Sequence, residues 1–209
     1  MTRQLGTIGE LADAIDAVSA RGRRKLIALA GPPASGKSTL ATQLAQELTK
    51  RGAKCAVVPM DGYHLSNQSL IERGLLDRKG APETFDTSGF RELVVSLREK
   101  ETVPFPTFNR ERDITLPGGG VVEAECDTVI LEGNYLLFDA PIWRDLRPFW
   151  DLSIALSVDE AMLRNRLVDR WLKHGLTAQM AEQRAEENDL RNARAVLQAA
   201  LTPDIRFAR

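Results

Sequence analysis

One short segment of the chain combines residue types and spacing that are suited to holding phosphate groups. Residues 31–38 read Gly-Pro-Pro-Ala-Ser-Gly-Lys-Ser, which matches the P-loop pattern of a glycine, four variable residues, and then glycine, lysine and serine. Its glycines let backbone N–H groups turn towards phosphate oxygens, and the start of a helix adds unpaired N–H groups. The segment therefore predicts a binding site for ATP. The predicted ATP-binding residues are Gly31, Ala34, Ser35, Gly36, Lys37, Ser38 and Thr39.

The polar residues at the end of this segment have distinct expected roles. Lys37 would bridge the β- and γ-phosphates, the Ser38 hydroxyl would ligate Mg²⁺, and Thr39 would contact the α-phosphate. The alternative is a glycine-rich turn that starts a helix by chance and binds no phosphate. Such a turn would not need a strand directly before it, whereas a P-loop does. Here the apolar run 26–30 comes directly before the segment, and apolar residues at helical spacing follow it. The context therefore favours a P-loop.

Two carboxylates follow apolar runs that read as strands. Asp61 comes one residue after the run 53–59, and Glu132 directly follows the run 128–131. Phosphoryl transfer to an alcohol needs a carboxylate that accepts the hydroxyl proton, and ligands bind beyond the carboxyl ends of parallel strands. Either residue could be this base. In the alternative without a catalytic role, Asp61 would cap a helix or turn and Glu132 would be an exposed residue of a turn. We assign proton transfer to Asp61 and magnesium, together with Ser38, to Glu132.

The two histidines do not predict a metal site of their own. His64 and His174 are the only histidines in the chain, and His64 stands in a polar segment without a second ligand beside it. It is either a solvated loop residue or a donor to a substrate hydroxyl.

A basic segment follows the last long strand. It contains Arg164, Arg166, Arg170, Lys173, Arg184, Arg191 and Arg194. Arg166 and Arg170 are four residues apart and therefore share one helix face. Helical arginines are often solvated and paired with nearby acids. Because Gly175 breaks the helical pattern, we expect instead a lid that closes over ATP, in which Arg166 and Arg170 neutralise charge in the transition state.

Strands that alternate with helices must position these residues. The predicted strands are 26–30, 53–59, 128–131, 152–158 and 205–207, and the predicted helices begin at 8, 37, 90 and 159. The order predicts an α/β protein with the three-layer P-loop NTPase fold, a mainly parallel sheet with helices on both faces. Residues 103–123 read as irregular, with a hairpin over 114–122 that turns at its glycines. We expect one kinase domain over 1–209, with an N-terminal helix in 1–24 and the lid and its flanking helices in 160–195.

The composition excludes several classes of protein. The 209 residues include 28 Lys and Arg against 29 Asp and Glu, and 43% are apolar, which excludes a disordered chain and argues against a generic nucleic-acid binder. Two cysteines are too few for a disulfide framework or a zinc site. No signal peptide and no membrane span is predicted, so we expect a cytoplasmic protein. A GTPase would show Asn-Lys-x-Asp after a strand, and none occurs.

With these residues assembled, the chain resembles the phosphoribulokinase/uridine kinase family of P-loop kinases. The resemblance rests on GPPASGKST at 31–39, MDGYH at 60–64, KGAPETFD at 79–86, PTFNRERD at 106–113, VILEGNYLL at 129–137 and the lid-like run from 174 to 196. Within the family these motifs are similar to the pantothenate-kinase-like branch and to bacterial proteins described as fructose-transport-system kinases or nucleoside/nucleotide kinases.

The resemblance implies a small-molecule kinase that uses ATP and Mg²⁺. The acceptor would be an alcohol of a sugar, nucleoside or pantothenate-like metabolite, bound near Tyr63, His64, Asp86 and Arg112. A homodimer and a functional link to a sugar transporter would accord with it. Two alternatives stay open: a nucleotide-binding regulatory module of a transport system without its own kinase turnover, and an ATPase without an alcohol acceptor. The presence of Asp61 beside a P-loop favours the kinase, because a switch needs no base.

Overall fold

Six short segments form one parallel sheet whose central strands are apolar enough to be buried on both faces. The computed structural model of the protein describes residues 2–208. The strands are β1 (Arg3–Leu5), β2 (Lys25–Ala30), β3 (Cys55–Pro59), β6 (Thr128–Gly133), β7 (Leu152–Ser157) and β8 (Ile205–Ala208). Their order in the sheet is β1-β8-β7-β2-β6-β3, with every neighbouring pair parallel. All five predicted strands are therefore confirmed, and β1 is an addition.

The register of the three strands at one side of the sheet decides where the chemical groups meet. Leu29 of β2 and Pro59 of β3 both lie opposite Glu132 of β6. The three strands therefore end at the same edge. Gly31 follows β2 and Asp61 follows β3, so the P-loop and both predicted carboxylates come together there.

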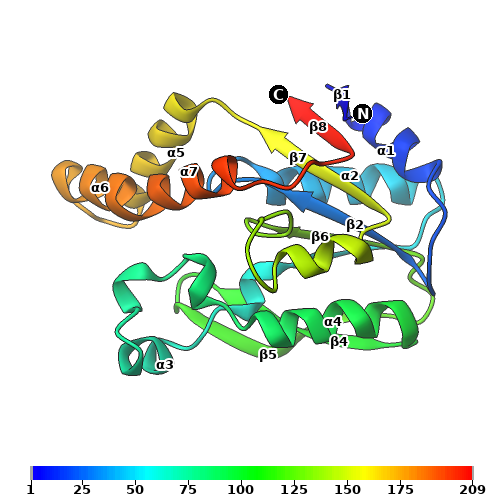
Figure 1. The fold of residues 1–209 in the computed structure, drawn as a ribbon, viewed down its shortest axis with the longest axis horizontal. Helices are drawn as coiled ribbons and strands as arrows, with labels where there is room; N and C mark the ends of the chain where they lie inside the picture. Colours follow the sequence, from blue (N-terminus) through cyan, green and yellow to red (C-terminus); the bar gives the residue numbers. More distant parts are fainter. Residues whose placement is uncertain (1, 209) are drawn as a thin grey trace.

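Helices cover both faces of the sheet (Figure 1). Their bounds are α1 (Ile8–Asp16), α2 (Lys37–Lys50), α3 (Asn67–Glu72), α4 (Thr87–Glu99), α5 (Glu160–Lys173), α6 (Ala178–Arg184) and α7 (Arg191–Gln198). One buried cluster joins α1 and α2 to the sheet, and another joins α4 to the opposite face. The predicted three-layer α/β fold is confirmed. Within residues 2–208, no helix is both long and apolar enough to cross a membrane.

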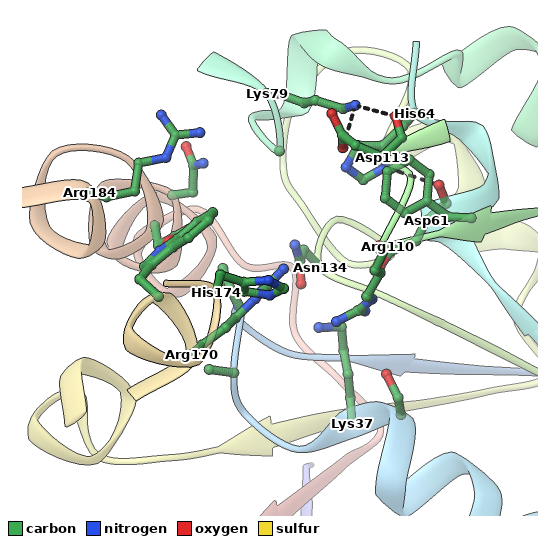
Figure 2. A pocket seen from close by; sticks show the side chains of 18 of the residues that line it. Lys37, Asp61, His64, Lys79, Arg110, Asp113, Asn134, Arg170, His174 and Arg184 are labelled. Atoms are coloured by element: carbon green, nitrogen blue, oxygen red, sulfur yellow. Dashed lines mark hydrogen bonds and ion pairs between the residues drawn. The ribbon is translucent and has the colours of Figure 1, made fainter. Parts of the chain in front are cut away.

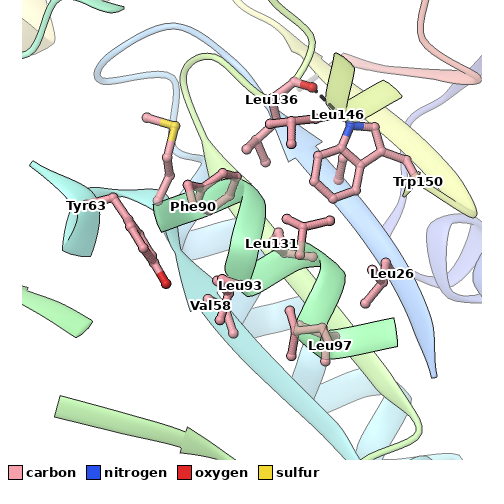
Figure 3. Packing of buried hydrophobic residues seen from close by; sticks show 14 of the residues in the cluster. Leu26, Val58, Tyr63, Phe90, Leu93, Leu97, Leu131, Leu136, Leu146 and Trp150 are labelled. Carbon is pink, nitrogen blue, oxygen red and sulfur yellow. Dashed lines mark hydrogen bonds between the residues drawn. The ribbon is translucent and has the colours of Figure 1, made fainter. Parts of the chain in front are cut away.

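The face covered by α4 shows how the helical period builds the core (Figure 3). Phe90, Leu93 and Leu97 recur at spacings of three and four and are all buried. They belong to one cluster with Leu131 of β6. Trp150, fully buried in the same cluster, donates its indole N–H to the Leu136 carbonyl at 3.0 Å, so its one polar atom is satisfied.

The helical arm that follows β7 consists of α5, α6, a π-helical turn (Ala185–Leu190) and α7. The predicted break near 173–177 is confirmed, because α5 ends at Lys173 and α6 begins at Ala178. Gly175 lies between them with φ of +86°, a left-handed conformation that glycine adopts at little cost. Figure 1 shows the helices of the arm extending together from one end of the sheet.

The predicted irregular region 103–123 is instead a two-stranded antiparallel ribbon, so that prediction was wrong. β4 (Val103–Asn109) pairs with β5 (Ile114–Val122), and the chain turns between them at residues 110–113. The glycines are inside β5 rather than at the turn. Gly119 lies against the Thr107 side chain and Gly120 against the Phe105 ring, too close for a Cβ at either position. The glycines are therefore explained by close packing across the ribbon.

The N-terminal helix is shorter than its apolar spacing predicts. Ile8, Leu11, Ala12, Ile15 and Val18 stand at helical spacing and predict a helix over residues 8–20, but α1 ends at Asp16. Its start is well defined, because Thr7 accepts a hydrogen bond from the Glu10 N–H and the Glu10 carboxylate accepts one from the Thr7 N–H. The chain after Ala17 carries Ser19 and Gly22, which favour turns over helix.

Candidate functional site

The P-loop is built by a turn between β2 and α2 that needs two left-handed residues. Ala34 has φ of +60° and Gly36 has φ of +93°. Gly36 is the N-cap of α2 and provides no side chain to cap it, so the N–H groups at this helix start remain available to an anion. A Cβ at Gly31 would lie 2.8 Å from the Ser35 hydroxyl oxygen, which explains the glycine there.

Lys37 and Ser38 occupy the first turn of α2, at the edge where the strands end. Ser38 donates its hydroxyl to Glu132 Oε1 at 2.7 Å, so the two residues predicted to share a metal are in contact. Lys37 is only 9% exposed, and burial lowers its pKa, against the opposing charges of Glu132 and Asp61.

Lys37, Ser38 and Asp61 line one cavity of about 850 Å³ (Figure 2), and Glu132 is joined to its lining through the hydrogen bond from Ser38. The P-loop forms its floor through residues such as Lys37. Asp61, His64 and Arg110 line one wall, and Arg170 and Arg184 of the helical arm line the wall that faces it. The cavity has room for the phosphates of a nucleotide and for a second small molecule beside them.

Asp61 is held ionised by its surroundings. Arg110 Nη2 donates to Asp61 Oδ2 at 2.8 Å. Burial acts to raise the pKa of Asp61, but the charges of Lys37 and Arg110, with the hydrogen bond from Arg110, outweigh burial and lower it. Asp61 is therefore a carboxylate at neutral pH, able to accept a proton.

Glu132 has the opposite electrostatic balance. Burial raises its pKa, and the nearby Lys37 and the Ser38 hydrogen bond offset burial only in part. A buried carboxylate of this kind is stabilised by an added cation. The structure thus separates the two carboxylates: Asp61 already has its cationic partners, while Glu132 lacks sufficient positive charge.

The residues beside Glu132 fit Mg²⁺. Its preferred ligands are oxygens, and proteins usually supply one or two of them while phosphates and water supply the rest. Ser38 and Glu132 provide such oxygens, and the side-chain oxygen of Asn134, also at the cavity, is buried without a hydrogen-bond partner. Among residues 2–208 no group of three or more histidines, cysteines, aspartates or glutamates is arranged to hold a metal ion.

His64 lies in an aromatic wall of the cavity. Its ring stacks on Phe108 with centroids 4.8 Å apart, and it meets the Phe85 ring edge-on at 4.2 Å. Its Nδ1–H donates to the Asp61 carbonyl at 3.0 Å, and burial lowers its pKa, so the ring is neutral and Nε2 can accept a hydrogen bond. This geometry agrees with a substrate-binding role and not with a metal ligand.

The two arginines predicted for the lid, Arg166 and Arg170, make different contacts. Arg170 lines the cavity, over the ring of Trp171 at 5.6 Å. Arg166 does not line it. Its Nη1 donates to the carbonyls of Ala34 and Ser35 at 3.2 and 3.3 Å, and so holds the outside of the P-loop.

Three residues predicted near the acceptor do not line the cavity. Tyr63 is buried against the Phe90 ring, with centroids 5.2 Å apart. Asp86 caps α4 by accepting the Gly89 N–H at 2.9 Å, and Arg112 is exposed in the turn of the ribbon. Each stands in a motif that does reach the cavity, but its own side chain points elsewhere or is used for folding.

Other residues of the same motifs take those places. Arg110 pairs with Asp61, and Lys79 Nζ donates to Asp113 Oδ1 at 2.7 Å and to Asn67 Oδ1 at 2.6 Å. The cavity residues that sequence reasoning did not assign include Asn67, Lys79, Phe108, Arg110, Asp113, Asn134, Trp171, Arg184, Asp189 and Asn192. Arg110 and Asp113 lie in the motif PTFNRERD at 106–113. The sequence therefore identified the segment, but not which of its residues face the cavity.

Comparison with known proteins gives the chain clear relatives. A family model described as "Chromatin associated protein KTI12" matches residues 25–74. An Escherichia coli protein named "Uncharacterized protein YggC" is 36% identical over 178 residues, which cover 84% of this chain and 73% of that protein. A Schizosaccharomyces pombe protein named "Putative uridine kinase" is 34% identical over 193 residues, 88% of this chain and 82% of that one. Among solved structures, one named "putative fructose transport system kinase", from a Silicibacter species, is 51% identical with a TM-score of 0.93 and covers 96% of this chain and 98% of that one.

Proposed function

The chain belongs to the phosphoribulokinase/uridine kinase family of P-loop kinases, and from that premise we propose that it transfers the γ-phosphoryl group of ATP to an alcohol of a sugar, nucleoside or pantothenate-like metabolite. Two of these relatives are named as kinases, one as a putative uridine kinase and one as a putative fructose transport system kinase, so their names do not agree on one acceptor. The observation that carries the proposal is that an ionised carboxylate, Asp61, faces the same cavity as the P-loop lysine, Lys37.

The nucleotide would bind with its phosphates on the P-loop. The free N–H groups at the start of α2 and the Lys37 ammonium, which line the cavity, would bind the β- and γ-phosphates. Arg166 keeps the loop in shape from outside by holding two of its carbonyls. Mg²⁺, held by Ser38 and Glu132, supplies charge neutralisation at the phosphates when bound.

Asp61 would prepare the acceptor. The acceptor hydroxyl lies between Asp61 and the γ-phosphorus, its oxygen forms the new P–O bond, and the bond from phosphorus to the bridging oxygen of ADP breaks. The hydroxyl proton passes to Asp61, which later releases it to water. Arg110 keeps Asp61 in place through its hydrogen bond, and His64 with its aromatic neighbours gives the acceptor a flat surface.

The helical arm would act as the lid of one kinase domain spanning residues 1–209. Arg170 faces the phosphate side of the cavity and would stabilise the negative charge that moves to the leaving oxygen. Pairing of β1 with β8 brings the two ends of the chain into the same sheet, which supports a single folding unit.

The test is a coupled assay of ADP formation by purified protein with ATP, Mg²⁺ and a panel containing fructose, uridine and pantothenate. A kinase shows acceptor-stimulated ADP formation and a phosphorylated acceptor. Asp61→Asn should lower kcat by about 10²–10⁴-fold, the usual contribution of a positioned base, while ATP still binds. Asp145→Asn makes the same chemical change at an exposed site outside the cavity and should have no effect.

Two results would overturn the proposal. If no acceptor in the panel stimulates ADP formation although ATP binds, the protein is better described as an ATP-binding regulatory module. If Asp61→Asn retains the wild-type rate, Asp61 is not the base, and Glu132→Gln then tests the other carboxylate.

A further inference from the structure

A short loop connects the acceptor side of the cavity to the helical arm. This loop, residues 76–80, is named here the acceptor loop, and four of its five residues line the cavity: Leu76, Asp77, Lys79 and Gly80. Arg78 is the exception. Its side chain reaches the arm, where it meets two buried amides.

The contacts of Arg78 are specific. Its Nη1 donates to Asn188 Oδ1 at 3.1 Å and its Nη2 donates to Asn192 Oδ1 at 3.2 Å. Asn188 and Asn192 are 4% and 2% exposed, so these amides depend on protein partners. Asn188 Nδ2 in turn donates to the Lys79 carbonyl at 3.1 Å, which closes the link back onto the acceptor loop.

A further contact joins the same two parts. Arg184 Nη1 donates to the Asp77 carbonyl at 3.3 Å, so two consecutive stretches of the arm hold the backbone of the acceptor loop. Asn188 lies in the π-helical turn, and Asn192 follows it at the start of α7. A π turn, with its i→i+5 hydrogen bonds, is rare and is frequently found at functional sites. In this protein the π-helical turn carries Asn188, which accepts a hydrogen bond from Arg78.

The arm and the acceptor loop serve different substrates in the proposed reaction. Arg170 of the arm faces the phosphates, whereas Lys79 of the acceptor loop forms part of the acceptor wall (Figure 2). In-line transfer requires both substrates to be held in one geometry, and small misplacements reduce the rate strongly. A rigid link between these two parts would meet that requirement.

We infer that Arg78 is a positioning residue, which fixes the acceptor loop to the helical arm through Asn188 and Asn192 and so aligns the acceptor with the γ-phosphoryl group. The inference rests on the proposed kinase function. With the link intact, the acceptor oxygen attacks phosphorus. When the link is loosened, water takes the acceptor's place, the products are ADP and inorganic phosphate, and the proton of the attacking water passes to Asp61.

The functional test compares Arg78→Gln, Arg78→Lys and the control Arg73→Gln. Arg73 is exposed at the end of α3, five residues before Arg78, so its variant loses the same charge outside the link. We expect Arg78→Gln to raise the KM for the acceptor about tenfold or more, to leave the KM for ATP within twofold, and to increase inorganic phosphate released per ADP. Arg78→Lys should be intermediate, because lysine cannot reach both amides with a planar fork. An unchanged acceptor KM and phosphate ratio in Arg78→Gln would overturn the inference.

A second measurement does not depend on knowing the acceptor. In amide hydrogen exchange, Arg78→Gln should accelerate exchange in both 75–81 and 185–193, while α4 remains as protected as in the wild type, which excludes general unfolding. Acceleration in only one of the two segments, or in neither, would show that Arg78 does not couple them. If wild-type protein has no acceptor-stimulated turnover, the kinase proposal fails separately, and the exchange result still decides whether the link exists.

Discussion

Asp151 offers a sharp test of what holds the sheet together away from the site. It immediately precedes β7, and its carboxylate is fully buried. Oδ2 accepts from Arg98 Nη1 and from the Leu26 N–H, both at 2.8 Å. Oδ1 accepts from the Arg21 Nε at 2.9 Å and from its backbone N–H at 3.2 Å. The carboxylate therefore ties the start of β2 to α4 and to the chain before β2.

Asp151→Asn should cost about 3 kcal/mol in free energy of unfolding. The amide keeps one acceptor oxygen and places N–H donors against donors at the other position, so half of these bonds are lost. Breaking a buried ion pair costs about 3–5 kcal/mol. The lower end applies because the Arg21 side chain is 55% exposed and can turn to water, whereas Arg98 at 11% cannot. Urea unfolding at pH 7 should show a midpoint lower by about 1 M, for a slope near 2–3 kcal/mol/M.

The cost should also depend on pH. Burial acts to raise the pKa of Asp151, but the hydrogen bonds from Arg98, the Leu26 N–H and Arg21 outweigh burial, so its pKa is lowered. A carboxyl with a lowered folded-state pKa contributes stability above its unfolded pKa of about 4 and loses it as the pH falls through the folded value. The difference between wild type and Asp151→Asn should therefore shrink below about pH 4.

The control for Asp151→Asn is the same substitution at an exposed aspartate. Asp145→Asn, at an exposed site six residues earlier, should leave the urea midpoint unchanged. A loss below 1 kcal/mol for Asp151→Asn, or a difference from wild type that stays constant down to pH 3, would refute the reasoning. Because Asp151 is not part of the cavity lining, ATP binding by the folded variant should match that of the wild type.

Two further variants test the site and the ribbon. Glu132→Gln should weaken Mg²⁺-dependent ATP binding with little effect on binding without Mg²⁺, measured by calorimetry; because burial raises the pKa of Glu132, the Mg²⁺ effect in wild type should also decline as the pH is lowered. Equal binding of Mg²⁺–ATP by both proteins would contradict the metal assignment. Gly120→Ala should destabilise the protein by about 1–3 kcal/mol in thermal or urea unfolding, because the added Cβ overlaps the buried Phe105 ring; Gly118→Ala, at a position with open space, serves as the comparison, with only backbone strain at its φ of +62°.

The parts of the site that the sequence predicts are those fixed by local order and by strand register. A strand, a glycine-rich turn and a helix are consecutive in the chain, so the P-loop follows from 26–50 alone. Asp61 and Glu132 directly follow or end their strands, and parallel strands end at one edge. No knowledge of side-chain packing is needed for either step.

The acceptor side could not be predicted in the same way, because it depends on which way side chains turn. Tyr63 and His64 are neighbours at the end of a short 3₁₀ turn, yet Tyr63 packs into the core and His64 lines the cavity. Arg110 and Arg112 are two residues apart around the ribbon turn, and only Arg110 reaches Asp61. The motif identifies the segment, while tertiary packing selects the residue.

The distribution of charge in the cavity explains why a chain with almost no net charge can bind a highly charged nucleotide. On the acceptor wall the cations are already paired, Lys79 with Asp113 and Arg110 with Asp61. Among residues 2–208, the cavity cations without an ion pair within 4 Å are Lys37, Arg170 and Arg184, on the P-loop and the arm. Unpaired positive charge in a confined space attracts anions strongly, whereas paired charge mainly fixes geometry. Under the proposed function, Lys37 and the arm cations would meet the phosphates of ATP, while the paired residues of the acceptor wall would orient the less charged alcohol.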